Sequence, residues 1–248
     1  MKKQKNRLEQ ESQAISNKKT VVCLKWGTKY SPDYVNVLYS MVRRHSGLNY
    51  DFVCLTENPA GLDGRIICKP LPKINVQGWW LKPYVFSRDL NFEGDVLFLD
   101  LDLVLFGNID NLWIYNPANF CIIRDFTRQM NPAWRKFNSS VFRFPAKQYH
   151  WIWDDFEKDH KKIIPKNHGD QDYLYSILSQ QARYWPDDWI QSYKWEMRDR
   201  SELGIVNGKR NFTHIKQPKV NPKCFIAVFH GDPNPHECKD PWVIENWK

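Results

Sequence analysis

The sequence predicts an α/β fold with a mainly parallel central sheet, on three observations. Short apolar runs rich in β-branched residues alternate along the chain with segments of helical periodicity, which is the order typical of βαβ units. Residues 96–99 are apolar without interruption, as expected of a strand buried on both faces of a parallel sheet. No internal repeat and no linker divides the 248 residues, so we expect a tail at 1–18 and a single domain at 19–248.

The elements can be assigned in order from their patterns. An apolar, β-branched run at 21–24 predicts the first strand. Ser31 can cap a helix, Pro32 suits its first position and Asp33 its first turn, and apolar residues then recur at helical spacing as far as Val42. By the same reasoning we expect further strands at 52–55, 66–68, 96–99, 120–123, 140–144 and 225–229, and helices at 81–90, 146–159 and 170–181.

The net charge of +8 suggests an anionic partner, but its distribution disfavours a nucleic-acid-binding surface. Residues 1–19 carry six basic side chains against two acidic ones, which is half of the net charge, so the rest of the chain is only mildly basic. We interpret residues 1–18 as a disordered basic tail that is dispensable for catalysis and adds at most a weak peripheral attraction to an anionic membrane. We expect no nucleic-acid partner.

The six cysteines predict free thiols and a cytoplasmic location. Four of them lie in apolar runs, where cysteine packs as a small hydrophobic residue, and no CxxC pair occurs. The N-terminus lacks the apolar stretch of a secretory signal, and no apolar run is long enough to cross a bilayer. Cys224, His230, His236 and Cys238 offer zinc-binding atoms, but their spacing lacks the close ligand pairs of common zinc modules, so zinc is a minor alternative.

Asp100 and Asp102 are the most informative residues, because they follow the buried apolar run directly. In an extended chain alternate side chains share a face, so both carboxylates would point the same way and Leu101 into the core. Such a pair repels itself and is costly to desolvate, and a divalent cation that prefers oxygen ligands would compensate it. The alternative is that one aspartate caps the next turn and the other is solvated.

The last predicted strand ends in His230 and Gly231. The carboxyl ends of parallel strands gather at one edge of a sheet, where ligands bind, so we expect His230 near Asp100 and Asp102. Two carboxylates and an imidazole favour manganese modestly over magnesium. Gly231 would let the backbone approach a phosphate group closely. The sequence therefore predicts a metal site at Asp100, Asp102 and His230.

Two further polar segments open predicted elements. Asp170, Gln171 and Asp172 begin a helix, where one aspartate would suffice as the N-cap, so the three together exceed what capping needs. Asn138 and the two serines after it open an apolar strand. The twelve tryptophans are scattered without a helical period; aromatic rings stack on sugars and bases, but we expect most of these rings in the core.

In this order, the segments above, together with Lys82 and the loop at 25–30, resemble a GT-A glycosyltransferase close to glycosyltransferase family 8, which includes bacterial galactosyltransferases and the glycogenins. The resemblance covers most of residues 20–240 and is greatest to a bacterial and large-virus branch. It implies a Rossmann-like GT-A fold, a UDP-sugar as donor, manganese or magnesium as cofactor, and a glycan or glycolipid as acceptor. It also implies that a hexose is transferred with retention at the anomeric carbon.

The resemblance implies roles for individual residues as well. The loop at 25–30 corresponds to the family's uridine-binding segment, and the motif that starts at His230 corresponds to its C-terminal metal- and diphosphate-binding segment. Asp170 and Gln171 match residues beside the anomeric carbon, and Asn138 matches one that lines the donor sugar. The resemblance thus implies donor-binding roles for Lys25, Trp26, Gly27, Thr28, Tyr30, Lys82, Asp100, Gly231 and His236.

Two other functional classes remain as alternatives. The run from 96 to 104 also resembles the opening motif of haloacid-dehalogenase phosphatases, in which Asp100 would be the nucleophile and Asp102 a general acid. That motif normally opens its domain, whereas a strand, a helix and two more strands come first here, and it leaves His230 without a role. A non-catalytic binder of nucleic acid or carbohydrate, which would use the basic tail and the tryptophans, leaves the acidic pair unexplained.

Overall fold

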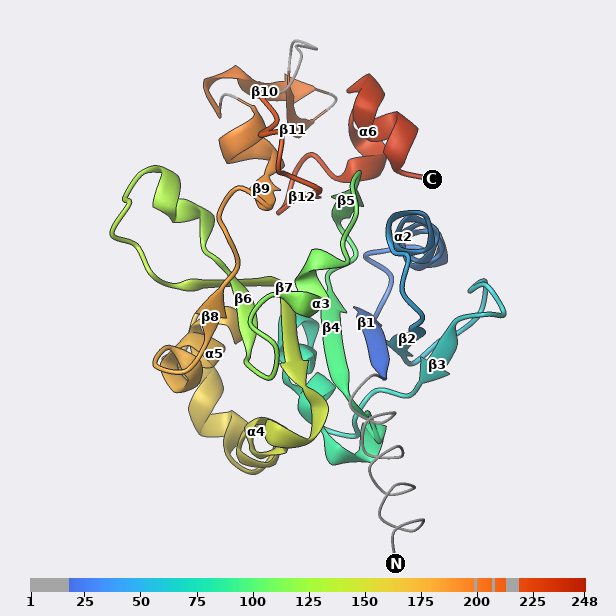
Figure 1. Cartoon of the computed structure of the whole chain (residues 1–248), viewed down its shortest axis with the longest axis vertical. Helices are drawn as coiled ribbons and strands as arrows, with labels where there is room; N and C mark the ends of the chain where they lie inside the picture. The colour runs from blue at the N-terminus through green and yellow to red at the C-terminus, as the bar shows by residue number, and fades with distance from the viewer. Residues whose placement is uncertain (1–17, 199, 207, 213–218) are drawn as a thin grey trace, which may run out of the picture.

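The computed structural model describes residues 18–198, 200–206, 208–212 and 219–248, and its architecture confirms the predicted fold class (Figure 1). A seven-stranded sheet with the strand order β3-β2-β1-β4-β7-β6-β8 forms its centre. The strands of this sheet are β1 (Lys19–Lys25), β2 (Asp51–Thr56), β3 (Ile67–Lys69), β4 (Asp95–Leu99), β6 (Cys121–Arg124), β7 (Phe137–Pro145) and β8 (Arg183–Tyr184).

Most strand pairs in this sheet are parallel, and β7 is the exception. β1 pairs in parallel with β2 and β4, β2 with β3, and β6 with β8, whereas β7 is antiparallel to both β4 and β6. Between β6 and β7 the described chain forms the short 3₁₀ helix η3 (Phe126–Gln129) instead of a long crossover, so it can return beside β6 in the opposite direction. As a result, β7 begins at the edge of the sheet where β1 and β4 end.

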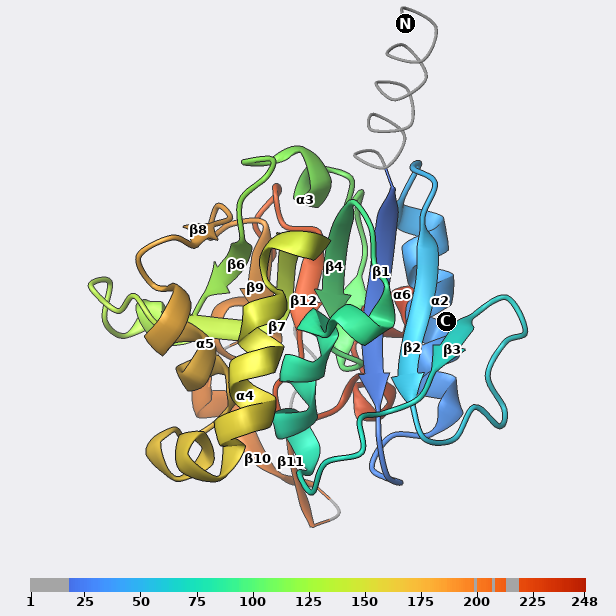
Figure 2. The same cartoon turned by 90° about the horizontal axis from the view of Figure 1, so that it is seen from below.

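Helices cover both faces of the sheet (Figure 2). α2 (Pro32–His45) packs its apolar side on one face, where Val35, Leu38 and Val42 are fully buried in the same cluster as Val21 of β1. α4 (His150–Ile163), α5 (Asp170–Leu178) and the 3₁₀ helix η1 (Gly78–Phe86) cover the other face. Both faces of β4 are therefore buried, as its uninterrupted apolar sequence predicts.

The prediction that the last strand joins the central sheet is wrong. β12 (Ile226–Val228) lies in a separate three-stranded sheet, between β5 (Leu103–Leu105) and β9 (Ile190–Ser192). β5 follows β4 after a turn that carries the chain out of the central sheet, and β12 pairs antiparallel with β5. The backbone N–H of Phe229 donates to the carbonyl oxygen of Asp102 over 3.0 Å, so this pairing still brings the residue after β12 to the end of β4.

Several other elements differ from the predicted ones in type or length. The helix expected at 81–90 consists of two 3₁₀ helices, η1 and η2 (Arg88–Leu90), because Pro83 interrupts regular α-helical hydrogen bonding. The helix expected at 146–159 begins only at His150, after a short 3₁₀ turn. The elements that the sequence pattern did not predict are β5, β8, β9, α3 (Asn111–Ile114), the hairpin of β10 (Leu203–Val206) and β11 (Lys209–Phe212), and α6 (Pro241–Asn246).

The structure describes all six cysteines, each as a free thiol, and Cys68 alone among them is exposed. Among the described residues, no helix combines the length and the apolar character needed to cross a membrane. Residues 1–17 of the predicted tail lie outside the described residues. Lys18, its last residue, accepts a hydrogen bond from the backbone N–H of Asp95 and pairs with Asp51 at 3.7 Å. The division into tail and domain stays a prediction.

Candidate active site

Three adjoining pockets lie at the edge of the sheet where β1 and β4 end and β7 begins. We name them the tryptophan pocket, between Trp26 and Trp79, the carboxylate pocket, around Asp100 and Asp102, and the aromatic pocket, beside Trp134. Shared wall residues join the carboxylate pocket to its two neighbours: Trp79, Lys82, Asp100 and Asp102 on one side, and Asn138, His168, Gln171, Asp172 and His230 on the other.

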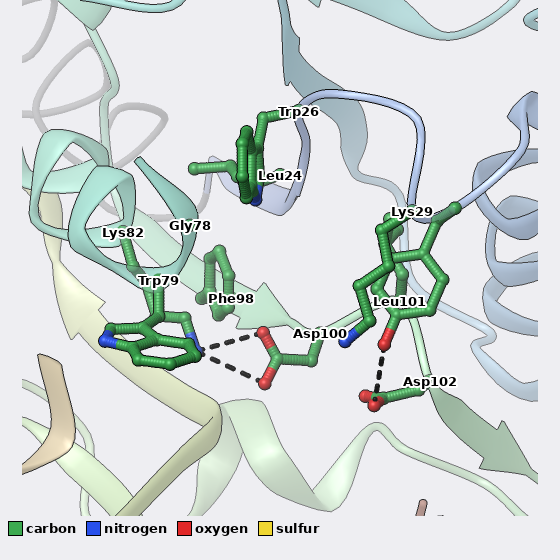
Figure 3. A pocket seen from close by; sticks show the side chains of 11 residues that line it. Leu24, Trp26, Lys29, Gly78, Trp79, Lys82, Phe98, Asp100, Leu101 and Asp102 are labelled. Atoms are coloured by element: carbon green, nitrogen blue, oxygen red, sulfur yellow. Dashed lines mark hydrogen bonds and ion pairs between the residues drawn. The ribbon is translucent and has the colours of Figure 1, made fainter. Parts of the chain in front are cut away.

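The two aspartates lie at a turn, and not in the extended chain from which we argued that their side chains would share a face. After β4 ends at Leu99, the chain turns at residues 101 and 102 and enters β5. The backbone N–H of Asp100 donates to the carbonyl oxygen of Ser140 in β7 over 2.8 Å, which fixes the start of the turn. Both carboxylates nevertheless line the tryptophan pocket and the carboxylate pocket (Figure 3).

Lys82 links carboxylates from two different elements, and Figure 3 shows its contact with the first of them, Asp100. The buried lysine side chain comes from η1, and its Nζ lies 3.0 Å from Asp100 Oδ1 and 3.5 Å from Asp170 Oδ2. It also donates to the backbone oxygen and to the hydroxyl of Ser139, over 3.2 Å in each case. Burial alone would lower the pKa of Lys82, but the charges of Asp100 and Asp170 raise it, so the amine is a cation held between two carboxylates.

Asp102 adds negative charge to the same place. It accepts a hydrogen bond from the Tyr30 hydroxyl over 3.1 Å. Burial and the neighbouring charge of Asp100 raise the pKa of Asp102 to about 7, and burial raises the pKa of Asp100 as well, against the opposing charge of Lys82. In the lining of the carboxylate pocket, Asp100, Asp102, Asp170 and Asp172 thus accompany a single lysine, Lys82. Carboxylate oxygens in such surroundings suit a hard divalent cation such as magnesium or manganese.

His230 reaches the carboxylate pocket from the end of β12. Its ring stacks on Phe126, with 5.6 Å between the ring centroids and 14° between the planes, and its Nε2 lies 2.6 Å from Ser192 Oγ. In the part of the chain that the structure describes, no three His, Cys, Asp or Glu side chains converge closely enough to hold a metal. Asp100, Asp102 and His230 thus line one pocket without forming a closed set of ligands.

The helix α5 presents its first turn to the cleft. Asp170 is 5% exposed and accepts a hydrogen bond from Ser139 Oγ over 2.6 Å, so its side chain binds β7 instead of capping its own helix. Asp172 accepts from Lys136 Nζ over 3.1 Å. Gln171 lines both the carboxylate pocket and the aromatic pocket, and its side chain makes no hydrogen bond to another described residue. Its amide is therefore available to a ligand.

Asn138 and Gly231 complete the predicted residues that line the carboxylate pocket. Asn138 is there because β7 runs antiparallel and so starts at the edge where β4 ends. Its Oδ1 accepts the backbone N–H of Ser140 over 3.1 Å, which orients the amide. Gly231 has a φ of +73°, a conformation that a residue with a Cβ adopts only with strain.

Some predicted donor-binding residues line none of the three pockets: Lys25, Gly27, Thr28 and His236. Lys25 is buried and donates to the carbonyl oxygen of Gly27 over 3.3 Å, and the Gly27 N–H donates to Glu57 Oε1 over 2.6 Å. These contacts hold the loop that presents Trp26 to the tryptophan pocket. His236 is half-exposed and its Nδ1 forms a hydrogen bond with the Tyr34 hydroxyl, between α2 and the C-terminal segment.

Sequence reasoning missed several aromatic residues of the cleft. Trp79 is 58% exposed and lines two pockets, although we expected most tryptophans in the core. Trp79 lies three residues before Lys82, and residues three apart share one face of a 3₁₀ helix, so this spacing could have indicated that Trp79 faces the same site as Lys82. Phe126 and Trp195 line the aromatic pocket, and no local pattern marks them, because distant loops bring them together.

The comparisons with known proteins agree with this architecture. No protein-family model matches the chain, and no curated protein matches its sequence. The structure is similar to that of the galactosyltransferase LgtC in complex with donor and acceptor sugar analogues, with a TM-score of 0.60 and 14% identity over 91% of this chain and 93% of that one. It is also similar to the glycosyltransferase GlyE of Streptococcus pneumoniae TIGR4, with a TM-score of 0.53 and 19% identity over 69% of this chain and 46% of that one.

A third similar structure is that of the bifunctional glycosyltransferase WbbM, with a TM-score of 0.56 and 11% identity over 94% of this chain and 51% of the other. At these identities the similarity establishes the fold. The order of the elements, the mainly parallel sheet and the three neighbours agree with one another. The chain therefore has the GT-A glycosyltransferase fold that its motifs resemble.

Proposed function

We propose that this protein is a glycosyltransferase that moves a hexose from a nucleotide-sugar, a UDP-sugar by resemblance, to a hydroxyl group of a glycan or glycolipid. The observation that carries the proposal is the row of three joined pockets with the Lys82–Asp100–Asp170 cluster at its centre. A transferase of this kind needs a nucleotide site, a reacting centre and an acceptor site in that order. The similarity to LgtC, which binds donor and acceptor sugar analogues, supports the assignment.

The tryptophan pocket suits the nucleoside of the donor. Its walls include Trp26, Tyr30, Trp79 and Phe98, and aromatic rings stack on bases and sugars. The pocket opens directly onto the carboxylate pocket, where Lys82 and Gly231 would face the diphosphate. The nucleoside would then lie in the tryptophan pocket and the diphosphate in the adjoining carboxylate pocket.

The carboxylate pocket suits the diphosphate and a divalent metal. Asp100 and Asp102 would hold the metal, and His230 lines the same pocket from the opposite sheet. When bound, manganese or magnesium would supply Lewis-acid chemistry that neutralises the charge of the leaving nucleoside diphosphate. Tyr30 would keep Asp102 oriented through its hydroxyl, and Lys82 would do the same for Asp100.

A thermal-shift panel of nucleotide-sugars tests the donor site. Each compound is added to the protein with manganese, with manganese replaced by EDTA, and to the Trp79→Ala variant. We expect UDP-sugars to raise the unfolding temperature only with the metal, and to raise it less in Trp79→Ala, because that ring forms a wall of both donor pockets. A panel in which no nucleotide-sugar stabilises the protein would contradict the proposal.

The junction of the carboxylate and aromatic pockets suits the reacting centre. As the sugar–phosphate bond breaks, positive charge develops at the anomeric carbon, and a nearby oxygen that is held in place stabilises it. Asp170 and Asp172 are each paired with a lysine, whereas Gln171 lies between the two pockets with its amide available. We assign the closest contact with the anomeric carbon to Gln171, and supporting roles to Asp170 and Asn138.

Replacing Gln171 by alanine is expected to lower turnover by about 10²-fold, the usual effect of removing one oriented dipole from a reacting centre. Donor affinity should stay nearly unchanged, because Gln171 lies outside the tryptophan pocket. Gln181→Ala, at an exposed position beyond α5, serves as the control. A Gln171→Ala enzyme with wild-type turnover would remove this residue from the site.

The anomeric configuration of the transfer product shows whether the enzyme retains or inverts. We propose retention on the resemblance, because both inverting and retaining enzymes can place the acceptor pocket beside the donor pocket. NMR of the product of an α-linked donor should show an α-linkage. A β-linked product would contradict retention.

We also propose that the basic tail is dispensable for catalysis and adds only weak attraction to anionic membranes. Deletion of residues 1–17 keeps Lys18, whose carbonyl oxygen is bonded to β4 and whose amine pairs with Asp51. We expect unchanged kcat/KM with a soluble acceptor, because the cleft lies at the other end of the strands from Lys18. Loss of turnover in the truncated protein would refute dispensability. Sedimentation of both proteins with phosphatidylserine vesicles tests the membrane contact.

A further inference from the structure

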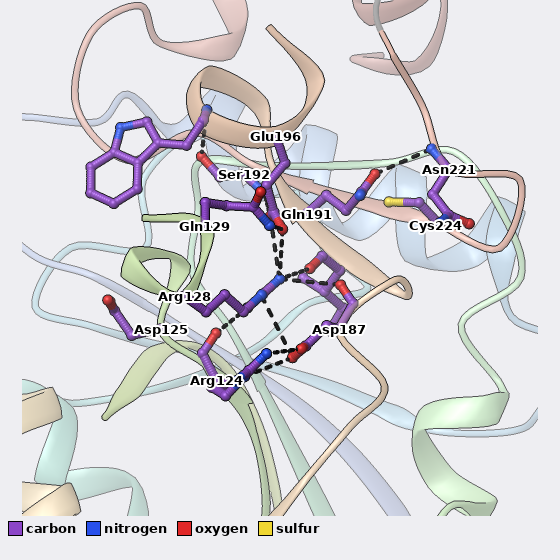
Figure 4. A network of polar contacts seen from close by, with 12 residues as sticks. Arg124, Asp125, Arg128, Gln129, Asp187, Gln191, Ser192, Glu196, Asn221 and Cys224 are labelled. Atoms are coloured by element: carbon purple, nitrogen blue, oxygen red, sulfur yellow. Dashed lines mark hydrogen bonds and ion pairs between the residues drawn. The ribbon is translucent and has the colours of Figure 1, made fainter. Parts of the chain in front are cut away.

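A buried polar network lies beside the aromatic pocket (Figure 4). It joins two segments of the chain. Arg128 lies in η3, and Glu196 lies in the helical turn η6 (Tyr193–Met197), which follows β9. Arg128 Nη2 lies 3.0 Å from Glu196 Oε1, and both side chains are almost fully buried, at 2% and 4% exposure. Arg124 and Asp187 extend the network on the outer side. None of these residues was singled out by a sequence motif.

All the partners of the Glu196 carboxylate are hydrogen-bond donors. Oε2 accepts the backbone N–H of Ser192 over 2.7 Å, and Oε1 accepts from Gln129 Nε2 over 2.6 Å. Arg128 Nη2 donates to both oxygens. An amide in place of the carboxylate would turn an NH₂ group toward one of these donors, so the site requires a carboxylate. Glu196 thus fixes the position of Ser192 and of η3 together.

Ser192 connects Glu196 to His230 through a hydrogen bond. Its Oγ lies 2.6 Å from His230 Nε2 and accepts the backbone N–H of Trp195 over 3.2 Å. The His230 ring is also parallel to Phe126 and edge-on to Trp195, with 5.1 Å between the latter centroids and 90° between the planes. All three contacts come from the two segments that Arg128 and Glu196 join.

We propose that Glu196 and Arg128 are positioning residues, which set the orientation of the His230 imidazole through Ser192, Phe126 and Trp195. The partner at one ring nitrogen of a histidine fixes its tautomer and ring plane, and so decides what the other nitrogen offers to a ligand. The consequence for metal and diphosphate rests on the proposed function of His230, but the positioning itself is a property of the protein without ligand.

A purely structural role is the competing explanation, and the chain offers a matched control for it. Arg198 and Asp240 form a second ion pair with the same exposure, 2% and 4%. This pair joins the end of η6 to α6, and Asp240 also accepts from the Tyr193 hydroxyl over 2.7 Å. Asp240→Asn therefore removes an equally buried carboxylate charge, one that pairs with Arg198 and Tyr193 instead of with Ser192 and Arg128.

The experiment compares Glu196→Gln, Glu196→Asp, Ser192→Ala and Asp240→Asn in the full chain. Glu196→Asp keeps the negative charge beside Arg128, but its shorter side chain holds the carboxylate farther from Ser192. This variant keeps the proposal testable if Glu196→Gln does not fold. Long-range ¹H–¹⁵N NMR reads the ring nitrogens of His230 in metal-free protein, with His230→Asn to assign its signals. Manganese affinity is measured by EPR, and the unfolding temperature by calorimetry.

We expect the ring signals of His230 to shift in both Glu196 variants and in Ser192→Ala, and manganese binding to weaken by about 10–100-fold, as for other outer-shell partners of metal ligands. Asp240→Asn should lower the unfolding temperature but leave the His230 signals unchanged. His230 signals that stay at their wild-type positions in the Glu196 variants, or that move as far in Asp240→Asn, would overturn the proposal. If the signals shift as expected but wild-type protein binds no manganese, the positioning is supported and the metal part of the proposed function fails.

Discussion

Replacing Asp102 by asparagine is expected to lower the turnover of a nucleotide-sugar by about 10²–10³-fold or more, on the scale set by the loss of one charged group at a reacting centre. The amide keeps the shape of the side chain and can still accept the Tyr30 hydroxyl, but it offers no negative charge to a metal. The loss should therefore appear in turnover and in metal affinity together.

The same substitution should not unfold the protein. Burial and the charge of Asp100 raise the pKa of Asp102 from 3.8 to about 7, so at neutral and higher pH the ionised carboxylate destabilises the folded state. Asparagine removes this cost, and we expect an unfolding temperature at pH 8 at least as high as that of the wild type. At a pH well below 3.8 the difference should vanish, because the carboxyl is then protonated in both folded and unfolded chains.

Asp95→Asn is the matched control for Asp102→Asn. Asp95 opens β4 at the end remote from the cleft, and burial raises the pKa of this carboxyl as well. We expect full turnover in this variant. Equal turnover in Asp95→Asn and Asp102→Asn would remove the acidic pair from the proposed site.

Replacing Lys82 by methionine is expected to cost both stability and donor affinity. The substitution leaves Asp100 and Asp170 without their shared cation in a buried place, and loss of one partner of a buried ion pair typically destabilises a protein by about 3–5 kcal/mol. The destabilisation should be largest at neutral pH and shrink as the pH falls, because Asp100, whose pKa burial already raises, can then take up a proton. Urea unfolding at pH 7 and pH 5 measures the loss of stability and its pH dependence.

Two further variants make this test specific. Lys136→Met removes a lysine that pairs with Asp172 at 3.1 Å but is 41% exposed, and should cost less than about 1 kcal/mol. The double variant Lys82→Met with Asp170→Asn should recover part of the stability, because one uncompensated charge is then gone. A Lys82→Met protein as stable as Lys136→Met would contradict the central place of Lys82.

The fold was largely predictable because long, strongly patterned elements dominate it. The β-branched runs of β1 and β4 and the capped, periodic α2 carry their structure in their local sequence. The second sheet could not be predicted in this way. The apolar run at 225–229 predicted β12 as a strand, but β5 and β9 have three residues each, too few to show a period, and the pairing of the three strands depends on the turn after β4.

Those residues of the candidate site that are charged could be predicted from the sequence, whereas those placed there by packing could not. Charged residues such as Lys82, Asp100 and Asp170 stand out in an apolar context, and the structure brings them together. His230 reaches the cleft by the pairing of β12 with β5, and not through the parallel sheet that we expected. Phe126 and Glu196 were not predictable, because their positions depend on contacts between distant loops.

We propose above that the bond between the sugar and the diphosphate of a nucleotide-sugar breaks in this cleft. The release of UDP from UDP-sugars is the direct test of this reaction. The purified protein is incubated with each UDP-sugar and manganese, with p-nitrophenyl phosphate, and with an oligonucleotide, each with and without EDTA. We expect UDP release that requires the metal and is lost in Asp102→Asn, and no cleavage of the other two substrates. Phosphate release from p-nitrophenyl phosphate that depends on Asp100, without UDP release from any UDP-sugar, would contradict the proposed reaction.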